Sequence, residues 1–235
     1  MMKTLLLIFL VFISLNAQAL YTTETELGYI QNGGNADIQT TNFKSVNVYS
    51  WDKYKTSFGG HYTYGETTNS VTVRNWDVNA KIEQEVSHRL ALFVGEVIEG
   101  NTFTGIQGRY NSDAGARYYY IQSEPENFFS ELGYRYAIEN RYAPIPDTID
   151  HKGRFYNEYN SQVSQSFQYR AWIEYIPNFT TGKDWLMNGE VSITSFLTSV
   201  FSLKLAYKGM YDNLPATPAL KNYDHLTTTS LVAKF

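Results

Sequence analysis

The sequence contains no cysteine and, after its first residues, no long apolar run. The lack of cysteine excludes a disulfide-stapled scaffold, a thiolate metal site and a catalytic cysteine. A basic excess is also missing, because the 235 residues carry a net charge of -4 and the pI is near 5.6. A nucleic-acid binder needs a basic footprint, so we predict no nucleic-acid partner.

Aromatic residues are abundant instead, with 20 Tyr and 14 Phe. Intrinsically disordered chains are poor in aromatic residues, so this composition favours a folded chain. The mean hydropathy of -0.35 is that of an ordinary soluble protein, and the length suits one all-β barrel as well as one or two smaller domains.

Residues 1–19 have the pattern of a secretory signal peptide. Lys3 precedes an apolar run over 5–15, and an A-x-A cleavage site follows at 17–19. The run is too short to cross a hydrocarbon core of about 30 Å as a helix. A buried N-terminal helix is the alternative. We expect a signal peptide over 1–19 and one exported domain over 20–235, which is periplasmic, secreted or in the outer membrane.

The rest of the chain alternates between apolar and polar residues with period two, the pattern of strands with two different faces. In 74–86, for example, Trp76, Val78 and Ala80 alternate with Asp77 and Lys81. About twelve strands are predicted, near 23–31, 38–50, 54–66, 74–86, 90–100, 107–121, 128–140, 153–163, 167–177, 185–194, 201–211 and 223–235. Proline-containing breaks separate several of them, one of which covers 143–152.

Three features favour an antiparallel transmembrane β-barrel over a secreted β-sandwich, which stays open as the alternative. Tyr and Trp gather near the predicted strand ends, as in the interface girdles of membrane barrels. The polar faces carry many charges, which a closed lumen tolerates. Finally, Leu231, Ala233 and Phe235 share one face of a terminal strand. They are the predicted signal for the barrel-assembly machinery.

Several segments carry a family resemblance: 26–29 (ELGY), the turn at 51–54 (WDKY), and the final stretches 203–207 (LKLAY) and 227–235 (TTTSLVAKF). The most specific part is the opening "LGY…GN…QT…N". These segments resemble the salt-induced outer-membrane protein family (YdiY-like), a bacterial domain-of-unknown-function family of predicted β-barrels. The resemblance implies an outer-membrane barrel in contact with lipid. It brings no catalytic residues to this chain.

If the apolar faces contact lipid, the polar faces line the lumen. The predicted lumen-lining residues are Lys44, His61, Asp77, Lys81, Glu83, Arg109, Arg117, Glu131, Arg135, Arg170, Glu174, Glu190, Lys204 and Lys208. The same faces also carry Glu24, Glu26, Lys55, Glu85, Asp113 and Glu158. Neither sign dominates, so two interpretations stay open: a salt-bridged interior that fills a narrow structural or stress-related barrel, and a polar channel for small solutes. Twelve strands lie between filled eight-stranded barrels and open sixteen-stranded porins.

Outer-membrane enzymes are the rival class. A lipase or protease needs a nucleophile, a His base and an orienting group. None of His61, His88, His151 and His225 lies in such a motif. We therefore predict no enzymatic activity, with a surface enzyme based on His61 as the alternative, and we predict no cofactor, no metal and no catalytic residue. The sequence leaves the oligomeric state open.

Overall fold

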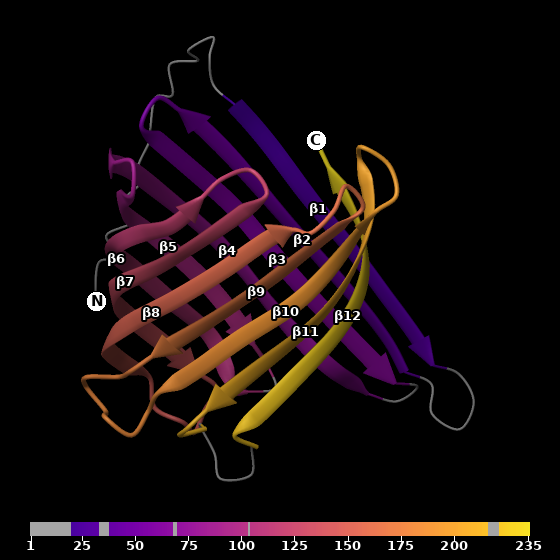
Figure 1. Ribbon diagram of the computed structural model, residues 1–235. Coiled ribbons are helices and arrows are strands. Elements are labelled where there is room, and N and C mark those ends of the chain that lie inside the picture. Colours follow the sequence, from indigo (N-terminus) through magenta and orange to yellow (C-terminus); the bar gives the residue numbers. More distant parts are fainter. Residues whose placement is uncertain (1–19, 33–37, 68–69, 103, 216–220) are drawn as a thin grey trace.

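The computed structural model describes residues 20–32, 38–67, 70–102, 104–215 and 221–235. These residues form one closed sheet in which twelve antiparallel strands follow chain order and the last strand pairs with the first (Figure 1). The strands are β1 (Leu20–Asn32), β2 (Ile38–Trp51), β3 (Tyr54–Thr67), β4 (Val71–Ser87), β5 (Leu90–Asn101), β6 (Ile106–Gln122), β7 (Glu126–Arg141), β8 (Thr148–Gln162), β9 (Phe167–Ile176), β10 (Leu186–Phe196), β11 (Phe201–Asp212) and β12 (Tyr223–Lys234). The predicted all-β antiparallel barrel is confirmed.

The two ends of the barrel differ in the length of their connections. The turns at 52–53, 88–89, 123–125, 163–166 and 197–200 lie at one end, which we call the turn end. The C-terminus lies there too, because Phe235 exchanges two backbone hydrogen bonds of 2.9 Å with Thr23. The longest connections, 177–185 and 213–222, belong to the opposite or loop end (Figure 1). Within the described part of the chain, no helix is long and apolar enough to cross a membrane.

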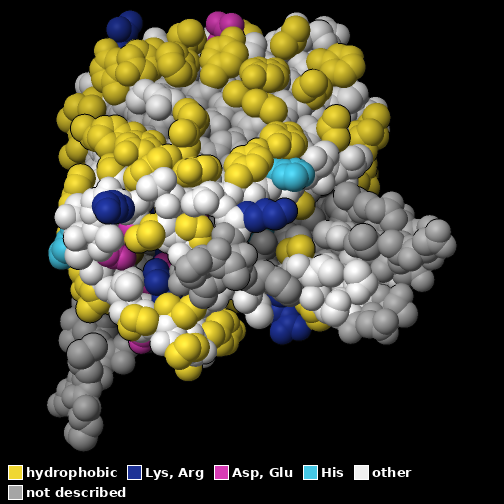
Figure 2. All heavy atoms as spheres, turned by 90° about the horizontal axis from the view of Figure 1, so that it is seen from below, with side chains coloured by type: hydrophobic (Ala, Val, Ile, Leu, Met, Phe, Trp, Pro, Cys, Tyr) yellow, Lys and Arg dark blue, Asp and Glu magenta, His cyan; other side chains and the backbone are white. Residues whose placement is uncertain are grey.

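The outer wall is apolar. Leu27, Phe58, Val94 and Leu132 are each more than half exposed on it, and hydrophobic side chains predominate over charged ones on the surface shown in Figure 2. Period-two alternation produces this wall, because successive side chains of a strand point to opposite faces. An apolar outside and a charged inside invert the pattern of soluble proteins.

One predicted boundary was wrong. The break expected over 143–152 ends earlier, because β8 begins at Thr148, where it pairs with Glu139 of β7. The prolines at 144 and 146 interrupt only the preceding loop, and Asp150 and Lys152 therefore lie in a strand. The signal peptide predicted over 1–19 lies outside the described residues.

Candidate functional site in the barrel interior

The strand register brings the predicted polar residues onto one inner surface. Directly opposed residues on neighbouring strands share a face of the sheet. One row of such partners crosses seven strands in the order Glu26, Lys44, His61, Asp77, Glu99, Arg109 and Glu139. A second row pairs Arg117 with Glu131 and continues to Tyr156, Glu174 and Asn188. The inner surface therefore mixes acids and bases on neighbouring strands, which places opposite charges within reach of one another.

Glu131 is the centre of the interior. It is only 2% exposed, and its Oε1 accepts hydrogen bonds from Lys81 Nζ at 2.5 Å and from Arg117 Nε at 2.8 Å. Its Oε2 accepts from Arg154 Nη1. Arg117 also donates from Nη1 to Glu83 at 2.7 Å. Lys81 belongs to β4 and Glu131 to β7, so this bond spans two intervening strands and crosses the interior.

Arg154 links Glu131 to a second group of ion pairs. Its Nε donates to Glu174 at 2.6 Å. Beside it, Arg135 holds Asp113 in a bidentate pair, with both nitrogen–oxygen distances at 2.7 Å. Two parallel hydrogen bonds fix the guanidinium plane against the carboxylate, which a lysine could not do.

A third group of ion pairs covers the seam where the barrel closes. Lys204 of β11 donates to Glu26 of β1 at 2.9 Å, and Lys44 of β2 reaches the same oxygen at 3.2 Å. Glu190 lies 3.7 Å from Lys204 and 3.6 Å from Arg170. Since β12 lies between β11 and β1, the Lys204–Glu26 pair bridges over the last strand. Ser230 of β12, 1% exposed, is covered there.

Smaller groups lie toward the loop end. Arg109 contacts Glu139 at 2.5 Å and Glu99 at 3.0 Å. His61 lies 3.3 Å from Asp77, and its other ring nitrogen is 2.8 Å from Thr63. The remaining predicted residue, Lys208, is opposite Glu190 in the register and has no ion-pair partner among the described residues.

The structure thus places every predicted lumen residue on the inner face. The prediction left out Glu99, Glu139, Asp150, Lys152 and Arg154, which also lie there. Asp150 and Lys152 were assigned to a loop. The inward position of Arg154 could have been predicted, because Arg154 and Glu158 are four residues apart on one strand and therefore point to the same face.

Aromatic rings fill the space around Glu131. The Phe93 ring lies over Gly115 and Gly133, and the Lys81 ammonium is 4.1 Å from its centre. Arg117 lies 4.2 Å from the centre of the Phe129 ring. These cations over ring faces gain electrostatic attraction in addition to their ion pairs.

A cavity lies toward each end of the interior. The loop-end cavity has a volume of about 590 Å³ and reaches down to Tyr156 and Arg170. The turn-end cavity has about 610 Å³ and begins at Asn160 and Gln168, further along the inner faces of the same strands. Buried charges lie between them, and we call this set the ion-pair layer: Lys81, Glu83, Arg117, Glu131, Arg154, Glu158 and Arg170. The four residues Glu83, Arg117, Glu131 and Glu158 line neither cavity, whereas the other three line the loop-end cavity.

Among the described residues, no group of three or more His, Asp or Glu side chains is placed to hold a metal ion. His61 has an acid at 3.3 Å and a threonine hydroxyl at 2.8 Å. Both partners lie inside the barrel wall, and the arrangement is that of a hydrogen-bonded lumen residue.

The family model described as "Protein of unknown function, DUF481" matches residues 25–235. The chain belongs to this family. The resemblance drawn from the opening and closing segments is thereby confirmed. No curated protein matches the chain by sequence.

Solved outer-membrane porins share the fold. The NanC porin is 12% identical, with a TM-score of 0.54 over 90% of this chain and 97% of that one. The KdgM porin is 8% identical, with a TM-score of 0.50 over 91% and 98%. At such low identity the likeness concerns the barrel fold and not a ligand.

Proposed function

We propose that this protein is a β-barrel of the Gram-negative outer membrane that forms a narrow passage for small polar solutes, closed at rest by the ion-pair layer. One observation carries the proposal. Two cavities of about 590 and 610 Å³, each lined by charged and amide side chains, lie toward opposite ends of the barrel, and the ion-pair layer lies between them with three of its members facing the loop-end cavity. No backbone segment crosses the lumen between them in the described residues, so side-chain rearrangement alone would join the cavities.

The charge distribution indicates weak selectivity for the sign of a solute. Each base of the layer contacts an acid, as Arg117 does with Glu83 and Arg170 with Glu158. A ring of one charge sign selects ions of the opposite sign, and the charges of the described residues form no such ring inside the barrel. We therefore expect cations and anions to permeate to similar extents.

The outer-membrane location is supported by the outer wall. Exposed tyrosines lie near both ends of the strands, with Tyr21 and Tyr54 at the turn end and Tyr110 and Tyr175 toward the loop end. Such aromatic girdles flank the apolar band of membrane barrels. Recovery of the protein in the outer-membrane fraction, with faster gel migration before heating than after, tests the location. Recovery in the soluble fraction would refute it.

The assembly machinery is the proposed biogenesis partner. Leu231 and Phe235 are 48% and 69% exposed on the outer face of the closing strand, while Lys234 lines the turn-end cavity. Before β12 pairs with β1, an assembly partner that pairs with β12 could contact these outward-facing side chains.

Planar-bilayer recordings test the passage. The double variant Arg117→Ser/Glu131→Ser removes one positive and one negative charge of the layer, leaves the net charge of the lumen unchanged and shortens both side chains. We expect a larger single-channel conductance than in the wild type, with a reversal potential near zero in a salt gradient. The matched control is Arg109→Ser/Glu139→Ser, the register partners of the same two strands toward the loop end. It removes an equal pair and leaves the layer intact.

A structural role is the second candidate function, favoured by how completely the middle of the barrel is filled. Small inner residues such as Ser192, Ser230 and Thr63 are at most 4% exposed. If wild type, double variant and control are all silent in bilayers, the passage is refuted and the filled envelope barrel stands.

A further inference from the structure

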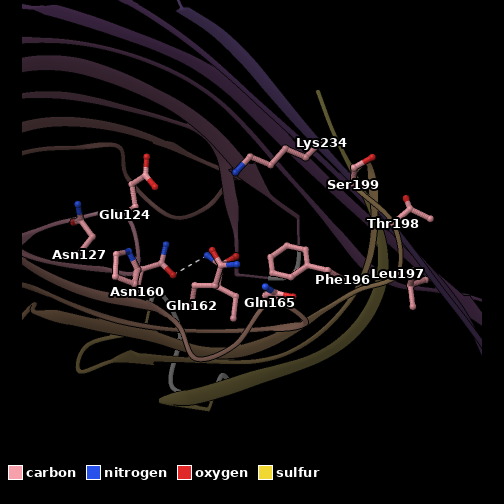
Figure 3. A pocket seen from close by; sticks show the side chains of 12 residues that line it. Glu124, Asn127, Asn160, Gln162, Gln165, Phe196, Leu197, Thr198, Ser199 and Lys234 are labelled. Carbon is pink, nitrogen blue, oxygen red and sulfur yellow. Dashed lines mark hydrogen bonds between the residues drawn. The ribbon is translucent and has the colours of Figure 1, made fainter.

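The turn-end cavity has a lining of a different kind from the rest of the interior. Five primary amides converge on it from the ends of three strands and one turn, together with one acid, one base and an aromatic ring (Figure 3). The amides belong to Asn127, Asn160, Gln162, Gln165 and Gln168. Asparagines also line the loop-end cavity, but there they lie among many ion-paired charges, whereas at the turn end uncharged donors and acceptors dominate.

Most of these amides are free to bind a ligand. Gln168 donates to Asn160 at 2.7 Å, so these two amides are already paired. In the part of the chain that the structure describes, the side chains of Asn127, Gln162 and Gln165 make no hydrogen bond. Each free amide offers two N–H donors and a carbonyl acceptor.

The other lining groups indicate the chemistry of the ligand. Glu124 and Lys234 contribute one charge of each sign, so the cavity favours no charged solute. Phe196 presents an aromatic ring to the cavity beside Gln165 (Figure 3). A saccharide has hydroxyls that both donate and accept, and a ring face of C–H groups that packs on an aromatic ring. The volume of about 610 Å³ lies within the range of ~300–1,000 Å³ typical of small-ligand sites.

From this we infer that the turn-end cavity is a binding site for a neutral saccharide. Amide side chains hold the hydroxyls, and Phe196 packs against the sugar ring. The inference deepens the proposed passage by naming a solute class, but binding itself requires no conduction.

The experiment observes the side-chain amides directly. Protein labelled with ¹⁵N in Asn and Gln is reconstituted in lipid nanodiscs and titrated with sucrose, while side-chain NH₂ signals are followed by NMR. The variant Gln162→Leu/Gln165→Leu lacks two of the side-chain NH₂ signals, and their disappearance assigns these signals to the cavity. In the wild type we expect the assigned signals to shift with sucrose until they saturate. Because a net hydrogen bond contributes modestly, loss of two amides should weaken binding about tenfold. Both glutamines are exposed, so the variant should fold.

The matched control is Gln84→Leu, an exposed glutamine at the turn end of β4 that lines neither cavity. It should bind sucrose as the wild type does. Glucuronate and trialanine serve as competing probes, the first for an acidic sugar and the second for a peptide. Tighter binding of either probe, equal weakening by the control variant, or no saturable shift with sucrose would overturn the inference.

The two proposals can fail separately. If sucrose binds but no conductance is recorded in planar bilayers, the saccharide site is supported and the passage is refuted. If conductance is recorded but sucrose shifts no amide signals, the passage is supported and the saccharide site is refuted.

Discussion

Replacing Glu131 by glutamine should destabilise the barrel, because this carboxylate holds three cations from three other strands. A glutamine of the same shape keeps one acceptor oxygen for Lys81 and Arg117. Its amide nitrogen then faces Arg154 Nη1, so that two donors meet where Oε2 now accepts. Arg154 retains Glu174 at 2.6 Å, which limits the loss.

The magnitude follows from the type of contact. One charge-assisted hydrogen bond contributes about 1.5–3 kcal/mol. Removing one partner of a buried ion pair costs about 3–5 kcal/mol, because the other charge stays buried. The loss should lie near the boundary of the two ranges, at about 3 kcal/mol.

Urea unfolding in lipid vesicles, followed by the fluorescence of the four tryptophans, measures the change. With a urea dependence of about 2 kcal/mol per molar, the midpoint should fall by about 1–2 M. The control Glu124→Gln alters an exposed turn carboxylate without an ion pair in the described residues and should leave the midpoint unchanged. Equal midpoints for both variants would show that the ion-pair layer adds no stability.

Two further substitutions test the packing and the geometry of the interior. Gly115→Ala should lower the refolded fraction and cost about 1–3 kcal/mol by overpacking, because its Cβ would meet Phe93 Cζ at 2.8 Å and Gly133 Cα at 2.7 Å. Gly182→Ala, with open space around it, is the control, and equal yields would contradict this packing. Arg135→Lys should lose about 1–2 kcal/mol by breaking the bidentate pair with Asp113. Arg170→Lys, which replaces a single hydrogen bond to Glu158, should lose less, and the reverse order in urea midpoints would refute the geometric argument.

Much of the fold could be predicted because alternation is a local property. Trp76, Val78 and Ala80 mark the outer face of β4 without any knowledge of the neighbouring strands. Which face meets lipid could not be derived that way, since a sandwich and a barrel share the same period. The apolar side chains exposed on the outside of the closed barrel decide it, and closure is shown by the pairing of β1 with β12.

For the candidate site, too, the local alternation was predictable and the contacts between distant strands were not. The phase of each strand was enough to place Lys81 and Glu131 on the inner surface. Their contact was not predictable, because it joins β4 to β7 across the curvature of the wall. The turn-end cavity escaped prediction for another reason: Glu124, Gln165 and Thr198 lie in turns, where no periodic pattern points a side chain inward.

The pair between Lys204 and Glu26 bears on the order of assembly. Its two members are 178 positions apart in the chain, and they meet only after β12 has taken its place between β11 and β1. Before closure, Glu26 already has Lys44 at 3.2 Å and Lys204 has Glu190 at 3.7 Å, each on a neighbouring strand. Closure adds the contact between Glu26 and Lys204, which a partly paired seam cannot make. The free energy of this contact is therefore gained only when the ring is complete, which favours a fully closed barrel over a partly closed one.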